Sequence, residues 1–324
     1  MKLKIILILM LITVPVIIMT TISTSVETTT DNNPIVIEYE ANFTDYNFPG
    51  LGTEESPYII DGLIIKDFSQ AYPYAGIRIN SITSHFVIKN CQISGYATGI
   101  SIYYSANGII ENNTFSDISI EAIHLDDSTN MFLLKNNLAG KIHNIGLEAV
   151  NNTIVKNNII TDGDPGIKLD YGSFNISITE NEIKNTDAGI DIIKSHNNTI
   201  DSNLIQSNSI GIDLYENSDN NTIKNNAFRF NFVSAKDRSL GVTNTFFKNY
   251  WSDYIGLDED GNGIGDAPYN ITGDANSKDY YPIIEDPYVT TTTTDPSAPG
   301  FTFFDVLAVI VIVFPILGMK KIKK

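Results

Sequence analysis

The residues of this sequence that could do chemistry recur at a regular spacing within short apolar segments. The segments follow the pattern small–apolar–x–apolar, and the x positions hold Arg78, Ser101, His124, Glu148, Lys168, Asp191 and Asp213. The position two residues after x holds Tyr103, Asp126, Asp170, Ile193 and Tyr215. If each segment is a strand, both positions point away from its apolar side. Stacked strands would then gather eight candidate ligand-binding residues on one face: His124, Asp126, Glu148, Lys168, Asp170, Asp191, Asp213 and Tyr215.

Two interpretations of this face remain open. Neighbouring carboxyls can bind sugar hydroxyls, or act as general acid and general base on a glycosidic bond. A lyase is a variant of the enzyme interpretation, in which the acids hold calcium and Lys168 is the base. The arginines outside the termini are Arg78, Arg229 and Arg238, too few to meet an acidic sugar, so neutral glycans fit better than uronates. The other interpretation is a solvated sheet face whose mixed charges keep the protein soluble.

A second candidate site is the segment DEDGNGIGD near the C-terminal end. Its oxygen ligands would follow the first positions of an EF-hand loop, with side chains from Asp258, Asp260, Asn262 and Asp266 and the carbonyl of Ile264. The bidentate Glu expected at the twelfth position is replaced by Tyr269, so the loop is incomplete. Calcium suits these hard oxygens, and a Gly/Asp turn without an ion is the alternative. Trp251 and several tyrosines nearby suggest a cap.

The element that must position these residues is a repeat. The pattern apolar-x-x-Asn ends at Asn90, Asn112, Asn136, Asn157, Asn181, Asn203, Asn226 and Asn249, at intervals of 21 to 24 residues. Each unit holds segments of strand length separated by turn-forming residues, and no unit could bury its apolar face alone. The spacing therefore predicts an all-β, right-handed parallel β-helix of about eight coils. The asparagines should stack into an internal ladder.

At this point the chain resembles a known group, the NosD-type right-handed β-helix proteins of the pectate-lyase-like superfamily. Three segments carry the resemblance: GLGTEESPYIIDGLII from Gly50, the repeats of residues 76–246, and NYWSDYIGLDEDGNGIGDAPYNI followed by DYYPI from Asp279. The resemblance covers roughly residues 45–285 and implies the parallel β-helix, with carbohydrate-active or periplasmic relatives.

The resemblance also implies copper, because the name-giving relatives assist copper loading of a nitrous oxide reductase. Copper favours imidazole and soft sulfur ligands. The four histidines, His85, His124, His143 and His196, fall at different phases of the repeat and show no pairing with one another or with Met at ligand spacing. A copper-handling role is therefore not expected from these residues.

The two ends of the chain predict export and tethering. Residues 1–25 read as a signal peptide, because two lysines precede an apolar run. Residues 26–44 are a linker and the start of the lead-in, and 45–286 the β-helix domain, with repeats over 76–246 and the cap over 247–286. Residues 287–300 form a Thr/Pro-rich stalk, and 301–324 a transmembrane anchor with a basic tail. The tripeptide PGF before the span resembles archaeal surface-sorting signals.

Composition excludes several functions. The chain has 38 acidic and 21 basic residues and a net charge of −17, which disfavours nucleic acid and anionic lipid. One cysteine, Cys91, excludes an internal disulfide. The sequence thus favours a cell-surface module, anchored in the membrane, that binds or scaffolds polysaccharide or another envelope component. A polysaccharide-cleaving hydrolase or lyase on the Asp-rich face is the alternative.

Overall fold

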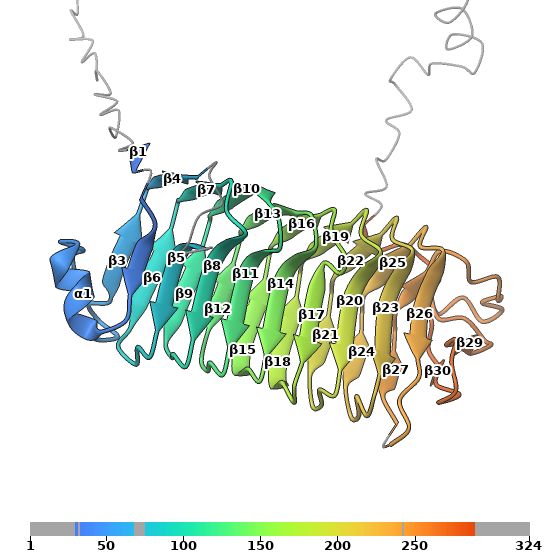
Figure 1. Cartoon of the computed structure of the whole chain (residues 1–324). Helices are drawn as coiled ribbons and strands as arrows, with labels where there is room; N and C mark the ends of the chain where they lie inside the picture. Colours follow the sequence, from blue (N-terminus) through green and yellow to red (C-terminus); the bar gives the residue numbers. More distant parts are fainter. Residues whose placement is uncertain (1–29, 32, 68–74, 242, 289–324) are drawn as a thin grey trace, which may run out of the picture.

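The chain winds into a parallel β-helix, a three-sided stack of coils (Figure 1). The computed structural model describes residues 30–31, 33–67, 75–241 and 243–288. Three sheets of ten, nine and eleven strands, named sheets A, B and C, run the length of the stack. Within the stack, a strand pairs in parallel register with its equivalents one coil before and after, and the exception is β29, which pairs antiparallel with β30 in the cap. The predicted fold is confirmed.

The strands follow one another around the coil in the order A, B, C, and each sheet has these members. Sheet A comprises β1 (Thr30–Asp31), β4 (Ile64–Lys66), β7 (Gln92–Ser94), β10 (Thr114–Ile118), β13 (Asn137–Gly140), β16 (Ile159–Thr161), β19 (Glu182–Lys184), β22 (Leu204–Gln206), β25 (Ala227–Arg229) and β28 (Tyr250–Trp251). Sheet B comprises β2 (Ile35–Ile37), β5 (Ala75–Asn80), β8 (Thr98–Tyr103), β11 (Glu121–Asp126), β14 (His143–Glu148), β17 (Ile167–Asp170), β20 (Ala188–Ile193), β23 (Ile210–Tyr215) and β26 (Val233–Asp237). Sheet C comprises β3 (Tyr58–Asp61), β6 (Phe86–Lys89), β9 (Gly108–Glu111), β12 (Phe132–Leu134), β15 (Asn151–Lys156), β18 (Phe174–Thr179), β21 (Thr199–Asp201), β24 (Thr222–Lys224), β27 (Thr245–Phe247), β30 (Lys278–Asp279) and β29 (Tyr269–Asn270).

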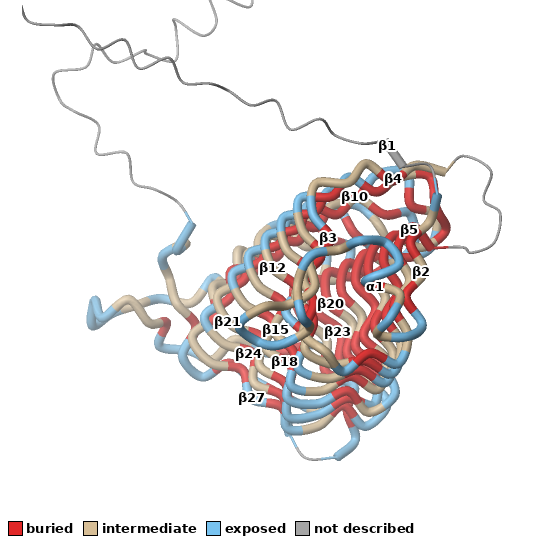
Figure 2. The backbone as a smooth tube through the Cα atoms, turned by 90° about the vertical axis from the view of Figure 1, so that its left-hand side faces the viewer, coloured by how far each residue is buried: buried red, intermediate tan, exposed pale blue. Residues whose placement is uncertain are grey.

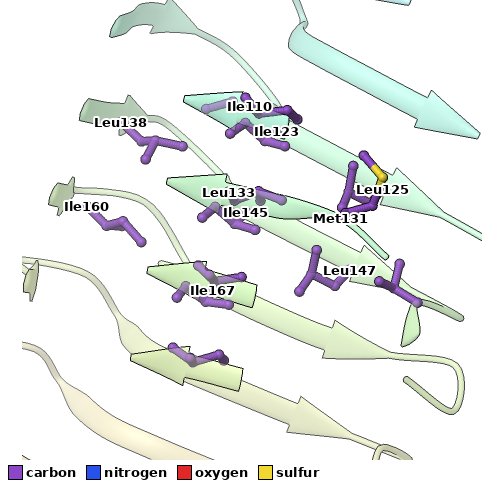
Figure 3. Close-up of a cluster of buried hydrophobic side chains, with 14 of the residues drawn as sticks. Ile110, Ile123, Leu125, Met131, Leu133, Leu138, Ile145, Leu147, Ile160 and Ile167 are labelled. Atoms are coloured by element: carbon purple, nitrogen blue, oxygen red, sulfur yellow. The ribbon is translucent and has the colours of Figure 1, made fainter. Parts of the chain in front are cut away.

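The core is a set of apolar columns that run along the inside of the stack. Figure 2 shows the buried residues as a continuous lining of the coils. In Figure 3, Ile123 lies beside Ile145 and Leu125 beside Leu147, and these residues are Cα partners in β11 and β14. Stacking like on like lets every coil bury the same face against its neighbours, which a single coil could not do.

Asparagine forms a second internal column at the turn between sheets C and A. In each coil the backbone N and the Nδ2 of one Asn donate to the Oδ1 of the next, as from Asn158 to Asn181 at 2.9 Å each. The Nδ2 group also donates to a carbonyl, such as that of Leu133. The column holds Asn113, Asn136, Asn158, Asn181, Asn203, Asn226 and Asn249. The predicted ladder therefore exists.

Three of the asparagines predicted for the ladder lie outside it, one residue too early. Asn90, Asn112 and Asn157 are exposed and have φ of 55, 54 and 57°. The ladder positions are taken by the residues that follow each of them, Cys91, Asn113 and Asn158. The residue before the ladder position has a left-handed backbone conformation, and Asn adopts that conformation readily. Asn therefore occurs at both positions, and the sequence pattern selected the earlier one.

Both ends of the stack are closed by aromatic side chains. At the N-terminal end, Phe43 of α1 (Glu40–Asp45) is buried and stacks on Tyr58 with ring centroids 4.3 Å apart. At the C-terminal end, Trp251 stacks on Phe228 at 4.5 Å and on Tyr269 at 4.3 Å. These rings cover apolar coil ends that would otherwise face water.

The last described residues turn back along the side of the stack. Asp286 forms an ion pair with Arg229 at 3.0 Å, and the Tyr288 hydroxyl donates to the carbonyl of Ser202 at 2.7 Å. Ser202 lies just before β22 of sheet A. The predicted signal peptide, most of the stalk and the anchor lie outside the described residues. Within the described part of the chain, no helix has the length and apolarity to cross a membrane.

We expect Asn181→Ala to unfold the stack more easily, because Asn181 is 1% exposed and accepts two hydrogen bonds from Asn158. Unpaired buried donors cost about 1–3 kcal/mol each, so the free energy of unfolding should fall by about 3–5 kcal/mol. Asn157→Gly, which keeps the left-handed turn, is the control. Urea denaturation measures both. A loss from Asn181→Ala no larger than that of the control would contradict the ladder's role.

Candidate functional site

The candidate residues lie on the outer side of sheet B, in two columns that run along the stack. The first column holds Arg78, Ser101, His124, Gly146, Lys168, Asp191, Asp213 and Lys236. The second holds Asn80, Tyr103, Asp126, Glu148 and Asp170, and in the next two coils Ile193 pairs with Tyr215. Successive members of a column are about 4.8 Å apart. All eight predicted binding residues are thus on one face.

One predicted position is wrong by two residues. Glu148 was expected in the column of His124, but Gly146 is the Cα partner of both His124 and Lys168. Glu148 pairs instead with Asp126 and Asp170. The pattern small–apolar–x–apolar matched Gly146 as the small residue, whereas in this coil Gly146 itself is the outward position.

The vacancy at Gly146 is filled by the carboxylate of Glu121. A Cβ at Gly146 would lie 2.5 Å from Oε1 of Glu121, so any larger residue would displace it. Glu121 is 8% exposed and contacts two imidazoles. Its Oε2 lies 2.7 Å from Nδ1 of His124, and its Oε1 lies 2.9 Å from Nδ1 of His143. We name these three residues the Glu121 cluster.

The charges in this cluster depend on one another. Burial would raise the pKa of Glu121, but its bonds to His124 and His143 outweigh burial and lower that pKa to about 2. Burial would lower the pKa of His124, yet the same carboxylate, with Glu148 and Asp126, raises it above its usual value. Tyr103 packs against His124 with ring centroids 5.4 Å apart. The cluster is therefore a buried carboxylate that favours the protonated form of the neighbouring His124 imidazole.

A second group lies three coils further on and is named the Asp191 cluster: Lys168, Asp191, Asp213 and Arg238. Arg238, from the turn after β26, donates to both oxygens of Asp213 at 3.2 and 2.6 Å. The same guanidinium lies 4.8 Å from the centre of the Tyr215 ring. The Asp213 side chain is 5% exposed and that of Arg238 is 46% exposed, so the carboxylate is buried while the guanidinium still meets water.

Asp191 is the unusual acid of the face, because other carboxylates lie beside it in a buried position. It is the Cα partner of Lys168 on one side and Asp213 on the other. Burial, then repulsion from Asp213 and from Asp164, raises the pKa of Asp191 to about 7. Burial, Asp191 and Asp213 also raise the pKa of Tyr215 to about 12. At neutral pH, Asp191 therefore has a substantial protonated fraction and can donate a hydrogen bond.

The face is more enclosed than a solvated sheet. In the Lys168–Asp170 pair, joined at 3.1 Å, the side chains are 21% and 11% exposed. In the pair Lys156–Glu180 at the edge of sheet C, they are 39% and 51% exposed. Burial of charge is costly unless the groups pair, and here they do. Simple solubility does not require this arrangement, so the observation weighs against the solvated-face interpretation.

The Asp/Gly loop has a self-contained geometry. Asp258 accepts from the backbone N of Asn262 at 3.0 Å and of Gly263 at 2.8 Å, and these bonds lower its pKa. Asp266 accepts from the backbone N of Glu259 at 2.8 Å. Asp260 accepts from Asn262, whose Oδ1 accepts from the backbone N of Ile264. Calcium binding here stays a prediction, because the carboxylates already bind the loop's own amides.

The chain is similar in sequence to a known protein family and to two of its members. A family described as "Periplasmic copper-binding protein (NosD)" matches residues 60–258, more than half of the chain. The chain belongs to the NosD family. Two relatives are each named "Probable ABC transporter binding protein NosD": one from Stutzerimonas stutzeri is 31% identical over 137 residues, and one from Pseudomonas aeruginosa is 28% identical over 136 residues. Each match covers 36% of this chain and 31% of the relative.

The solved structures that resemble this chain include proteins with different functions, an epimerase and an adhesin. The periplasmic alginate epimerase AlgG is 19% identical, with a TM-score of 0.47 over 62% of this chain and 50% of that one. The adhesin PfbA of Streptococcus pneumoniae is 14% identical, with a TM-score of 0.49 over 59% of this chain and 71% of that one. At these values the likeness does not indicate what the NosD-family chain binds.

The family's description names copper, but the described residues do not include a suitable set of copper ligands. No three His, Cys, Asp or Glu side chains gather there in a metal-binding group. His124 and His143 do meet, contrary to the expectation that no histidines pair, but both direct Nδ1 at Glu121. Met131 is 0% exposed, and burial raises the pKa of the Cys91 thiol to about 11. The described side chains therefore do not fit a copper centre.

Three site residues were missed from the sequence: Glu121, His143 and Arg238. Glu121 and His143 are Cα partners, and their separation of 22 residues equals a repeat interval, which is the signal that reveals them. Arg238 lies in the turn after the last strand of sheet B, where the repeat pattern ends. The repeat interval therefore does not predict its contact with Asp213.

We expect Glu121→Gln to lower the pKa of His124, because burial then acts without the opposing carboxylate. The stabilisation from a raised His pKa is complete below about 6.5 and lost as pH rises through the folded value, whereas that from Glu121 is complete above about 4.5 and lost as pH falls toward 2. Imidazole proton NMR titration measures the shift. Glu180→Gln is the control, and an unchanged His124 titration would disprove the coupling.

If the Asp/Gly loop binds calcium, a chelator should lower the melting temperature by a few degrees, because a ligand that binds the native state stabilises it. Asp258→Asn should remove this calcium dependence, and Asp274→Asn, elsewhere in the cap, should keep it. Thermal scans with and without calcium give the result. Identical curves for the unsubstituted chain would refute the ion.

Proposed function

We propose that this NosD-family chain is an exported, membrane-tethered protein whose sheet B face binds a neutral polysaccharide of the cell envelope. The observation that carries the proposal is the enclosed, mutually paired set of polar side chains on that face, from the Glu121 cluster to the Asp191 cluster. Export and tethering rest on the apolar runs at 5–19 and 301–319 of the sequence.

The periodicity of the face favours a long, repeating ligand. Polar side chains recur along straight columns about 4.8 Å apart, so successive units of a polymer can each meet a donor or an acceptor. Tyr103 and Tyr215 lie in the second column and offer aromatic rings to sugar faces. A small ligand would contact only one coil, and it would not require polar side chains on five successive coils.

The charge balance favours a neutral polymer. Asp213 is paired with Arg238, and Asp170 with Lys168, so neither cation is free to meet an acidic sugar. The chain as a whole has a net charge of −17 and repels polyanions. A hydroxyl-rich chain can instead accept from a protonated Asp191 and donate to the carboxylates around it.

Cleavage of the bound polymer is the second candidate, favoured by the position of Asp191 beside Asp213. Retaining glycosidases use two carboxyl groups about 5–5.5 Å apart, close to the spacing of adjacent coils. One acid must hold a proton at working pH while the other is ionised. The pKa of about 7 suits Asp191 to the acid role, and Asp213, which accepts two hydrogen bonds from Arg238, is the candidate for the other role.

A glycan array tests binding. We expect the chain to retain an uncharged polysaccharide, and Asp191→Asn with Asp213→Asn together to weaken binding at least tenfold. Glu111→Gln, which alters a charge pair on sheet C, is the matched control. Release of reducing ends by the unsubstituted chain would identify cleavage. The proposal fails if the double variant binds every glycan as the unsubstituted chain does.

The pH dependence follows from the protonated form of Asp191. Affinity should fall as pH rises through about 7, because the ionised carboxylate can no longer donate. Asp191→Asn keeps a donor at all pH values and should flatten this profile. The same substitution should also stabilise the fold near pH 8, since ionising an acid with a raised pKa opposes folding.

A further inference from the structure

One outward column of sheet C changes character halfway along the stack. Its first five members are apolar: Ile59, Val87, Ile109, Phe132 and Ile154. Its next four are Ser177, Thr199, Thr222 and Thr245. All nine occupy the same position of the coil, so the β-helix accepts threonine there. The apolar half of the column is therefore not required by the fold.

Three consecutive members of the apolar half form the floor of a groove of about 520 Å³. Val87, Ile109 and Phe132 line it, and Phe132 is 37% exposed although it is a large aromatic residue. Glu54 and Pro57, from the lead-in, and His85 complete the lining. The volume is within the range of small-molecule sites, which join an apolar floor to a few polar groups.

One wall of the groove is a column of amides. Asn107, Asn130 and Asn152 have φ of 62, 54 and 48° and lie one coil apart. Asn130 donates to Oδ1 of Asn107 at 3.3 Å, and Asn107 donates to the Thr83 carbonyl at 2.9 Å. These bonds orient the side chains. Each amide oxygen has two lone pairs, so it can also accept from a bound hydroxyl.

The groove selects against charge. Of its described lining residues, Glu54 and His85 are the ionisable ones. The neighbouring outward charges are neutralised in pairs, Lys89 with Asp61 at 3.5 Å and Lys135 with Glu111 at 2.9 Å. An uncharged ligand therefore enters at the lowest cost in desolvation.

The occupant must use both the apolar floor and the amide wall. An acyl chain would leave the amides unused. A peptide could not add as a strand, because sheet C already pairs its backbone groups between coils. A linear sugar chain satisfies both surfaces, since its C–H faces pack on Phe132 and its hydroxyls reach the amides at intervals of about 4.8 Å.

We propose that the groove on sheet C, from His85 to Asn152, is a binding site for a linear, uncharged oligosaccharide. It lies on a different sheet from the polar face of sheet B and depends on none of its residues. The two proposals can therefore fail separately.

Calorimetric titration of the full-length chain in phosphatidylcholine nanodiscs tests the site. The probes are the hexasaccharides of cellulose, laminarin, mannan and chitin, together with an unlabelled apolar octapeptide and lauric acid. We expect at least one hexasaccharide to bind, and Phe132→Thr to weaken it at least tenfold. That variant places in the groove the residue that the same column carries at Thr222, so folding should be preserved. Its melting curve verifies this.

Asn130→Gly, which removes an amide and keeps the left-handed turn, should also weaken binding several-fold. Thr222→Ser, in the same column outside the groove, should have no effect. Binding of the peptide or lauric acid that Phe132→Thr removes would overturn the oligosaccharide assignment. Hexasaccharide binding that is lost in the double variant Asp191→Asn with Asp213→Asn but kept in Phe132→Thr would place the ligand on sheet B alone and overturn the site. So would the absence of binding by every probe.

Discussion

The hydrogen bond from one asparagine amide to the next is the interaction on which the stack depends. Every rung from Asn113 to Asn249 donates in the same direction, so the amide dipoles align along the axis. Such a chain must end on a group that only accepts. Asp279, 0% exposed, receives the backbone N and Nδ2 of Asn249 and the Nε1 of Trp251. A second ladder runs from Asn198 through Asn221 to Asn244, and it ends in the same way, with Asn244 donating to Asp237.

A buried carboxylate is usually a cost, but here it is the physical complement of the ladder. Asp279 takes bonds from donors that would otherwise be unpaired, and Asp237 also accepts from Ser239 and Ser277. The cap therefore does more than cover an apolar end with aromatic rings. It supplies the negative end of a polarised column, and it fixes the register of the last coils on which Arg238 reaches Asp213.

The repeat in the sequence was enough to predict the fold, because a regular interval dictates which residues stack. It also placed the eight candidate residues on one face, since side-chain direction alternates along a strand. Its errors are of one kind. A left-handed residue before the ladder made Asn112 resemble Asn113, and the irregular coil at Gly146 displaced Glu148 by one step. Contacts between coils, such as those of Glu121 with His143, need the exact register. Contacts from turns, such as that of Arg238, have no periodic signal.

Both ends of the described body are on the same flank. β1 is the first strand of sheet A, and Tyr288 rests against Ser202 at the margin of that sheet. Within the described residues, the terminal segments contact sheet A and the turn before it, and the proposed sites lie on sheets B and C. A body attached through either end would present these two sides to separate polymer chains at once. If both proposed sites bind, a single body would hold two polymer chains together.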